Sequence, residues 1–485
     1  MQIELTYFPY MRSYFVYIII VLSLWSCKKT SVLDLKDYIT FSTDTLSFDT
    51  VFTNQGSFTL PLKIYNPQDK SIVLNSIKLK QGTTSPFKLN INGIASVEEQ
   101  YVTLQAKDSM YIFATVTIDP NNANTPFLVE DKIVVNFNNR TFELPLQARG
   151  QNAYYIVDST LQTQTWKTDK PYVIIHNAAV DENQTLTIPA GCRVYMHADS
   201  RLFVLGTLAV LGTKKDSVVF QGDRLDRAYF GGKDYPGEWG GIYFTSFSKN
   251  NIIQYAIIKN GGASTKLGTG SFIAATIQVN PDSVFSSSPQ LTLKNTIIKN
   301  SFGYGIISFG AEIYAENCLL HDCSASVLAI LQGGTYTFMN CNFLNIPGQT
   351  LAKTSHVDQP IVALLNYYDI DNTNYVAGNL NANFTNCLFW GTLADEVFIN
   401  KKNGASCTIQ FSNCLLKQQV GLPSYVTLNG NLYNLDPLFT NPSTLNFVPK
   451  VNSPLIGAGV TLNQFTKDLA DKTRTTPYDI GCYNH

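Results

Sequence analysis

"FTNCLFWG", residues 384–391, has three close relatives in the chain: "AENCLLHD" (315–322), "FMNCNFLN" (338–345) and "FSNCLLKQ" (411–418). In each, a cysteine follows an asparagine inside a short apolar run. The asparagines stand at 317, 340, 386 and 413, so successive gaps are 23, 46 (twice 23) and 27 residues. "LKNTIIKN" adds Asn295, 22 residues before Asn317, and "IQYAIIKN" (253–260) is an earlier copy. A period near 22–23 residues predicts a solenoid.

Two solenoids have this period, and the residues between two copies separate them. Leucine-rich repeats need an L-x-x-L-x-L pattern and often a helix. Residues 296–316, "TIIKNSFGYGIISFGAEIYAE", contain three glycines and alternating β segments, with no helical stretch. This favours a parallel β-helix, whose coils stack about 4.8 Å apart. Alternation then predicts that Cys341 and Phe343 point inward and that Asn342 points outward.

The repeated asparagine has a physical explanation in such a coil. A bend between two strands needs a residue that tolerates the left-handed conformation, and asparagine does so best after glycine. We expect its side chain to hydrogen-bond to its equivalents above and below, as a ladder. The following cysteine would lie on the inner stack as a small hydrophobic residue.

Further motifs extend the array in both directions. "LFVLGTLAVLGT" (202–213), "DSVVFQG" (216–222), "PGEWGGIYF" (236–244) and the closing "NSPLIGAG" (452–459) and "DIGCY" (479–483) together resemble right-handed parallel β-helix repeat proteins of bacterial envelopes. The resemblance covers about residues 170–483. It implies an all-β chain with a linker or cap at 151–172, a right-handed parallel β-helix at 173–450 and a closing segment at 451–485. The motifs are structural, so they imply a fold and no activity.

A smaller β domain is predicted ahead of the array, at residues 38–150. Short alternating runs such as "FTLPLKIYNP" (58–67) and "MYIFATVTIDP" (110–120) are separated by turn signals. Six or seven such strands suit an immunoglobulin-like β-sandwich. Asn66 and the closing Leu146–Gly150 resemble the abnormal-spindle/hydin-like sandwiches, which implies a spacer or interaction module.

The N-terminus indicates export. From Met11, a candidate true start, the chain is "MRSYFVYIIIVLSLWSCKK"; Arg12 precedes an apolar run over 14–25 that is too short to span a bilayer but suits a signal peptide. Leu24–Cys27 resembles the lipobox of bacterial lipoproteins, although Trp25 departs from the usual small residue. The resemblance implies a signal peptide at 1–27, lipid attachment at Cys27 and a tether at 28–37. An ordinary signal peptide with an incidental cysteine stays open.

Charge limits the partners. Lys and Arg number 35 and Asp and Glu 36, with no basic run, so no nucleic-acid partner is expected. We expect an outer-membrane-anchored protein of the cell envelope, on the periplasmic face or the cell surface. Its expected partners are the membrane, through the lipid, and a polysaccharide or another envelope protein.

Eight cysteines remain after Cys27, and an even number in an exported protein suggests disulfides. However, equivalent side chains in stacked coils run parallel rather than toward each other. Most are therefore expected to be reduced core thiols, with Cys318/Cys323 and Cys407/Cys414 left open as pairs. No CxxC pair occurs and the five histidines are scattered, so no metal site is predicted.

Enzymes of the resembled fold include pectate lyases and polygalacturonases. Lyases need calcium-binding carboxylates with an Arg or Lys base, and hydrolases need paired carboxylates. The motifs that these families carry are absent here; "RTTPYD" (474–479) does not fit the lyase pattern. We therefore predict a non-catalytic binding or structural protein without cofactors. A polysaccharide lyase or glycoside hydrolase is the alternative, and calcium is expected only for a lyase.

Two stretches are candidate glycan-binding sites. The insertion "GDRLDRAYFGGKDYPGEWGG" (222–241) concentrates charge in a charge-poor array, at Asp223, Arg224, Asp226, Arg227, Asp234 and Glu238. "NYYDIDNTNY" (366–375) mixes aromatic rings with acids and amides, at Tyr367, Tyr368, Asp369, Asp371 and Tyr375. A salt-bridged loop over Trp239 and a plain surface loop are the structural alternatives. His197, Asp199 and Arg201 are expected near each other at a coil edge. Convergence of three acids with a Lys or Arg in a groove would favour an enzyme.

Overall fold

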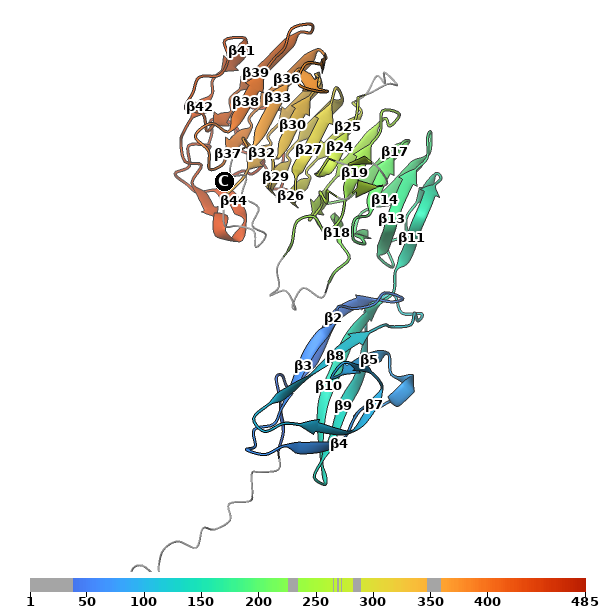
Figure 1. Ribbon diagram of the computed structural model, residues 1–485. Helices are drawn as coiled ribbons and strands as arrows, with labels where there is room; N and C mark the ends of the chain where they lie inside the picture. Colours follow the sequence, from blue (N-terminus) through green and yellow to red (C-terminus); the bar gives the residue numbers. More distant parts are fainter. Residues whose placement is uncertain are drawn as a thin grey trace, which may run out of the picture. The chain divides into compact units, whose positions relative to one another are not determined.

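The computed structural model describes residues 38–225, 234–264, 266–267, 270–271, 273–281, 289–346 and 359–485, with backbone alone at 266–267 and 270–271 (Figure 1). The signal peptide, Cys27, Asp226 and Arg227 therefore lie outside the described residues. Across the described ranges the chain is β-structure and loops, with 3-10 turns at Gly82–Thr84 and Pro442–Thr444. Within the same ranges no helix is long and apolar enough to cross a membrane.

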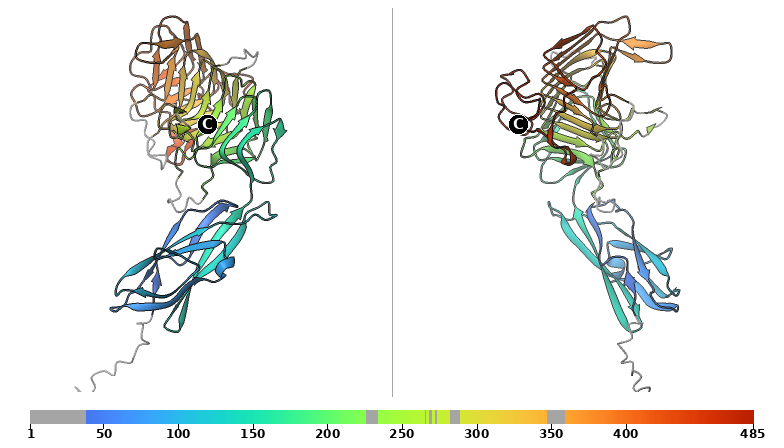
Figure 2. Two further views of the ribbon diagram at one scale, coloured as in Figure 1. Left: turned by 45° about the vertical axis from the view of Figure 1, so that its right-hand side comes forward. Right: turned by 90° about the vertical axis from the view of Figure 1, so that its left-hand side faces the viewer.

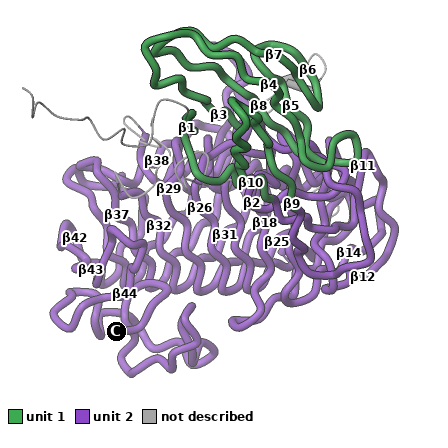
Figure 3. The backbone as a smooth tube through the Cα atoms, turned by 90° about the horizontal axis from the view of Figure 1, so that it is seen from below, with its two compact units in different colours: residues 1–47, 59–116, 130–147 green, residues 48–58, 117–129, 148–485 purple. Residues whose placement is uncertain are grey.

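The chain divides into two compact units (Figure 3). The described part of the first unit comprises residues 38–47, 59–116 and 130–147. The second comprises residues 48–58, 117–129 and the described residues from 148 to 485.

Residues 40–151 form two five-stranded sheets, which make up the β-sandwich. The first sheet has the order β1 (Thr40–Phe41), β3 (Leu60–Tyr65), β8 (Ser109–Val116), β5 (Phe87–Ile91), β6 (Ile94–Ala95). The second has the order β2 (Leu46–Phe52), β10 (Arg140–Gln151), β9 (Phe127–Phe137), β4 (Ile72–Leu79), β7 (Glu98–Leu104). Alternate residues are buried, as in β8, because period-2 side chains point to opposite faces. Asn66 closes a turn here, since its Nδ2 donates to the carbonyls of Lys70 and Gln105.

The second unit is a solenoid whose coils each contribute up to three strands, so that three faces of parallel strands form (Figures 1 and 2). β11 (Tyr154–Leu161) and β13 (Tyr172–Val180) begin the stack, and β13 pairs with the first strand of two faces. Face 1 is the ten-stranded sheet β12 (Gln164–Thr165), β14 (Thr185–Pro189), β17 (Thr207–Leu211), β20 (Asn251–Gln254), β25 (Leu291–Lys294), β28 (Glu312–Glu316), β31 (Gly334–Met339), β36 (Leu380–Thr385), β39 (Cys407–Ser412), β41 (Val426–Asn429).

Faces 2 and 3 share one continuous sheet with β11 and β13. Face 2 contains β15 (Arg193–Met196), β18 (Val218–Gly222), β21 (Ala256–Lys259), β26 (Ile297–Ser301), β29 (Leu319–Cys323), β32 (Asn342–Leu344), β37 (Leu388–Trp390), β40 (Leu415–Leu416), β42 (Leu432–Tyr433). Face 3 contains β16 (Arg201–Val204), β19 (Gly241–Phe244), β24 (Ala275–Val279), β27 (Tyr304–Phe309), β30 (Leu328–Leu331), β33 (Val362–Leu365), β38 (Val397–Asn400). Three antiparallel pairs lie outside the faces: β22 (Lys266–Leu267) with β23 (Gly270–Ser271), β34 (Tyr367–Asp369) with β35 (Tyr375–Ala377), and β43 (Phe439–Asn441) with β44 (Asn446–Pro449).

Equivalent inward residues of successive coils stack in the core. Phe338, Phe384 and Phe411 form a column of parallel rings with centroids 5.2 and 5.0 Å apart. That spacing is close to the separation of neighbouring strands, so the strand pairing itself sets the stacking distance. Cys341 and Phe343 point into this core, which confirms the predicted alternation.

The repeated asparagines form the bend between face 1 and face 2. Asn295, Asn317, Asn340, Asn386 and Asn413 all have φ between 48° and 52°, which confirms the left-handed conformation. The predicted ladder holds only in part. Asn386 donates from Nδ2 to Asn340 Oδ1 at 3.0 Å, whereas Asn317 and Asn413 donate to the carbonyls of Lys467 and Ala458. The full ladder is wrong because the C-terminal segment offers these two side chains acceptors of its own.

Residues 437–485, which we name the strap, run over the outer side of face 2. Outward leucines of four coils pack with strap residues in one cluster, which includes Leu319, Leu344, Leu388, Leu415, Phe439, Phe447, Leu455, Leu469, Ile480 and Cys482. Asn342 points away from the core, as predicted, yet it is buried because its Oδ1 accepts from the Cys482 amide at 3.0 Å. Arg474 donates from Nη2 to Asn317 Oδ1 at 2.7 Å.

The eight described cysteines are free thiols. Cys318, Cys341, Cys387 and Cys414 follow the bend asparagines and are fully buried, as predicted, while Cys407 is half-buried. Burial raises the pKa of Cys387 and raises that of Cys192 to about 11. These thiols are therefore packing groups.

Candidate functional site

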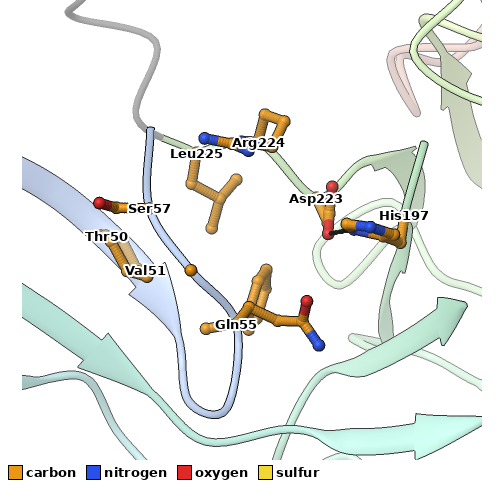
Figure 4. Close-up of a pocket in the computed structure, with 10 residues that line it drawn as sticks. Thr50, Val51, Gln55, Ser57, His197, Asp223, Arg224 and Leu225 are labelled. Carbon is orange, nitrogen blue, oxygen red and sulfur yellow. Dashed lines mark hydrogen bonds and ion pairs between the residues drawn. The ribbon is translucent and has the colours of Figure 1, made fainter. Parts of the chain in front are cut away.

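The charged insertion does not form one site: it lies between β18 and β19, and its charged residues contact different neighbouring coils, Asp223 the preceding one and Asp234 the following one. Asp223 follows β18 and is buried, and its Oδ2 lies 2.6 Å from His197 Nδ1 (Figure 4). This hydrogen bond raises the pKa of His197. The Arg224 guanidinium carbon lies 3.1 Å from the centroid of the Phe58 ring.

These residues line a small pocket of the second unit together with Thr50, Gln55, Ser57 and Leu225. Its free space is about 20 Å³, which is room for a single water molecule. The pocket is therefore too small for a sugar ring, and the His197–Asp223 pair is an ion pair at the coil edge.

Asp234 and Glu238 contact residues of the following coil. Asp234 Oδ2 lies 3.0 Å from Lys259 Nζ. Glu238 occupies the space over Gly222, which has no side chain there, and accepts from Asn260 Nδ2 at 3.3 Å. Asn260 in turn accepts from Asn300 Nδ2 at 3.1 Å, so one asparagine pair links two coils at the bend between faces 2 and 3.

Lys259, Lys299 and His321 occupy equivalent outward positions of three successive coils on face 2. Burial lowers the pKa of Lys299, and the neighbouring Lys259 adds to this effect. His321 Nδ1 lies 2.7 Å from Asp322 Oδ2, and both residues are buried beneath Phe447 of the strap. The charges of this row are thus paired or covered, and they do not form an open, acid-rich groove.

The second candidate stretch forms the β34–β35 hairpin. Tyr367 and Tyr375 gather around Lys402, whose Nζ lies 4.3 and 4.6 Å from the two ring centroids and also contacts Asp369. Tyr368 turns to Phe309, at 5.3 Å between centroids. The ammonium group therefore occupies the space in which a sugar would stack on the two rings.

Asp371 closes the tip of this hairpin. Its carboxylate accepts from the Asn374 side chain and from the amides of Thr373 and Asn374. These hydrogen bonds, the Asn374 side chain first, hold the pKa of Asp371 well below its usual range. The acid thus maintains the turn.

Face 1 presents a surface that the sequence analysis did not single out. The outward residues of β31, β36, β39 and β41 are almost all uncharged hydrogen-bonding side chains in register, here named the polar strip: Thr335, Thr337, Asn381, Asn383, Thr385, Thr408, Gln410, Ser412, Thr427 and Asn429. The alternation in "GTYTF" (334–338), "NANFT" (381–385) and "CTIQFS" (407–412) was the available signal.

Charge on face 1 appears on the two preceding coils, in β25 and β28. Lys294 Nζ lies 3.1 Å from Glu316 Oε1, and Tyr314 donates to the same carboxylate at 2.7 Å. From β31 onward the four strands contain no Asp, Glu, Lys or Arg. Outward side chains that are neighbours on one strand hydrogen-bond to each other; Gln410 Nε2, for example, donates to Ser412 Oγ at 2.9 Å. The strip is thus a neutral surface of donors and acceptors.

No group of three or more His, Cys, Asp or Glu side chains that could hold a metal ion occurs in the part of the chain that the structure describes.

The strand order and pairing define an all-β protein: a right-handed parallel β-helix preceded by a β-sandwich. Among solved structures it is similar to the A-module of the mannuronan C-5 epimerase AlgE6 from Azotobacter vinelandii, with 10% identity, 59% of this chain and 91% of that chain covered, and a TM-score of 0.32. It is also similar to pectate lyase Pel9A, with 10% identity, coverage of 69% and 96%, and a TM-score of 0.30. These likenesses concern the fold alone.

Other matches are partial. The chain spans 26% of a family 123 glycoside hydrolase from Clostridium perfringens and 54% of a chain from the Salmonella enterica SafA pilin–SafB chaperone complex. No protein-family model and no curated protein sequence matches the chain.

Proposed function

We propose that the protein is a non-catalytic, membrane-anchored lipoprotein of the cell envelope, and that the polar strip of face 1 binds a neutral polysaccharide. The observation that supports this is the run of in-register, uncharged hydrogen-bonding side chains from β31 to β41. A neutral polysaccharide presents hydroxyl groups at regular intervals and no charge. A flat array of amides and hydroxyls matches it without burying an unpaired ion.

In this proposal the lipid on Cys27 holds the protein at the outer membrane, and residues 28–37 are the tether. Several acyl chains on one cysteine anchor a protein stably, whereas one chain binds only marginally. Cys27→Ser should release the protein into the soluble fraction. Retention of the variant in membranes would contradict lipidation at this residue.

A polysaccharide lyase or hydrolase is the second candidate, and the Lys259–Lys299–His321 row beside Asp234 and Asp322 is the observation that favours it. We rank it second because His321 and Asp322 are covered by the strap. An assay on acidic polysaccharides with calcium, read out as new reducing or unsaturated ends, decides between the two. Turnover would overturn the non-catalytic proposal.

Binding is tested by co-sedimentation with insoluble neutral polysaccharides and on a glycan array. Asn383 and Gln410 are in-register neighbours at the centre of the strip, so Asn383→Ala with Gln410→Ala should weaken binding at least about tenfold, as expected for two lost hydrogen bonds. The matched control is Thr187→Ala with Gln254→Ala. Both residues point outward from face 1, but on its early strands β14 and β20, so this double variant should bind normally. If both double variants bind the polysaccharide equally well, the polar strip is not the binding site.

A further inference from the structure

We infer that a hollow at the bend between faces 2 and 3 is a second sugar site, which takes a single neutral pyranose ring. The hollow measures about 360 Å³ and is lined by Asp199, Pro236, Gly237, Ala263, Ser264 and Phe302. That volume lies within the range of small-molecule sites. The inference goes beyond the proposed function, because the site lies away from face 1 and takes one ring rather than a polymer.

The walls of the hollow are held rigidly by backbone hydrogen bonds. Gly237 N and Phe302 N both donate to the carbonyl of Gly261, at 3.1 and 3.0 Å, and Ala263 N donates to Trp239 O at 2.9 Å. Trp239 is fully buried below, and its Nε1 donates to Lys259 O at 2.8 Å. A site whose walls are fixed in advance loses little entropy on binding.

Arg201 joins two of these walls from beneath. It is buried, and its guanidinium donates to the carbonyl of Asp199 at 3.2 Å and to that of Ala263 at 3.0 Å. A side chain at Gly240 would collide with it, since an added Cβ would lie 2.4 Å from Arg201 Cγ. The "PGEWGG" turn thus makes room for the arginine that positions Asp199. Arg201 is a positioning residue here.

The lining matches the two chemical sides of a pyranose. Phe302 is 51% exposed and lines the hollow, so its ring can contact the C–H groups of a sugar. Asp199 also lines the hollow, and its carboxylate oxygens can accept from sugar hydroxyls. Ser264 adds a hydroxyl that both donates and accepts. An aromatic platform beside hydrogen-bonding acceptors is the common arrangement for a sugar ring.

The experiment titrates the purified full chain with methyl hexopyranosides and follows binding by ligand-observed NMR. Phe302→Ala and Asp199→Asn should each weaken binding about tenfold, which is the loss of roughly one stacking or charged hydrogen-bond contact. Phe247→Ala is the control, because Phe247 is 53% exposed and does not line the hollow. Both site variants should sediment with polysaccharide as the parent does, which separates this site from the polar strip.

Three outcomes would overturn the inference. In the first, the methyl glycosides bind this protein no more tightly than they bind an unrelated protein. In the second, they bind both site variants as tightly as the parent. In the third, choline, an organic cation suited to a ring beside a carboxylate, binds in the hollow and the sugars do not. Loss of polysaccharide binding with intact glycoside binding would contradict the proposed function and leave this site supported.

Discussion

Asn386 joins three parts of the β-helix through one side chain. Its Nδ2 donates to Asn340 Oδ1 of the preceding coil at 3.0 Å and to the carbonyl of Val460 at 2.8 Å, while its Oδ1 accepts from the Val460 amide at 2.8 Å. The residue also has a φ of 52°. One asparagine therefore forms the bend, links two coils and fixes the strap.

Replacement of Asn386 should be costly for two separable reasons. Asn386→Ala removes the hydrogen bonds in a buried position and puts alanine, which tolerates the left-handed region less well than asparagine, at this φ, so we expect a loss of about 2–4 kcal/mol in the free energy of unfolding. Asn386→Gly should lose less, because glycine accepts this backbone freely. Urea unfolding followed by circular dichroism measures both. Asn183→Ala, at φ 58° on the surface, is the control and should lose only about 1 kcal/mol; an equal loss at both positions would contradict the role of the side chain.

Thiol reactivity should follow burial. With Ellman's reagent at pH 8, we expect the native protein to react slowly at Cys407 and hardly at all at the seven buried cysteines. Burial raises the pKa of Cys192 to about 11 and also raises that of Cys407, so little thiolate is present at this pH. All eight should react once the chain is unfolded in guanidinium. Rapid reaction of several thiols in the native protein would show that the core is open.

The His197–Asp223 pair should make stability depend on pH. The pKa of His197 is raised in the folded state, so the pair stabilises fully below the unfolded value of about 6.5, and this stabilisation is lost as the pH rises through the folded pKa. His197→Gln should therefore lower the unfolding midpoint more at pH 5 than at pH 9. His176→Gln, which breaks an exposed pair with Asp158, is the control and should change little at either pH. An equal effect of His197→Gln at both pH values would refute the charged pair.

The strap should be loosened by a polar substitution beneath it. Ile480 is buried against the outward leucines of face 2, and Ile480→Asn should lose about 3 kcal/mol, since it removes apolar burial and buries an amide. Limited proteolysis with mass spectrometry should then show faster cleavage between 437 and 485. Val451→Asn, at a position 90% exposed in the same segment, is the control and should be cleaved at the parental rate. If the Ile480→Asn variant is cleaved no faster than the parent, the contacts of Ile480 do not hold the strap in place.

The architecture could be predicted from local sequence because a solenoid repeats a local rule. One asparagine per coil at a left-handed bend, followed by a small inward residue, appears directly in the spacing of Asn317, Asn340, Asn386 and Asn413. The strap contacts could not be predicted, since Arg474 meets Asn317 across 157 residues and no period connects them.

The surfaces were harder to predict than the core. The charged insertion was the most conspicuous feature of a charge-poor chain, yet Asp223 and Asp234 form separate ion pairs with His197 and Lys259, which lie on two different coils. The polar strip consists of common threonines and asparagines, and their alignment becomes meaningful only once the register of four distant strands is known. The hollow beside Phe302 joins residues from four coils and had no local signal.

The strap also fixes the number of coils between Asn317 and Asn413. In an open solenoid each repeat contacts only its neighbours, so repeats can be gained or lost by duplication and deletion. Here residues 458, 460, 467 and 474 are matched to Asn413, Asn386 and Asn317 on three separate coils. One extra coil among them would displace a partner by about 4.8 Å, beyond the reach of a hydrogen bond. The length of this stretch is thereby locked against repeat expansion, and its outer face is completed only once residues 437–485 have been synthesised.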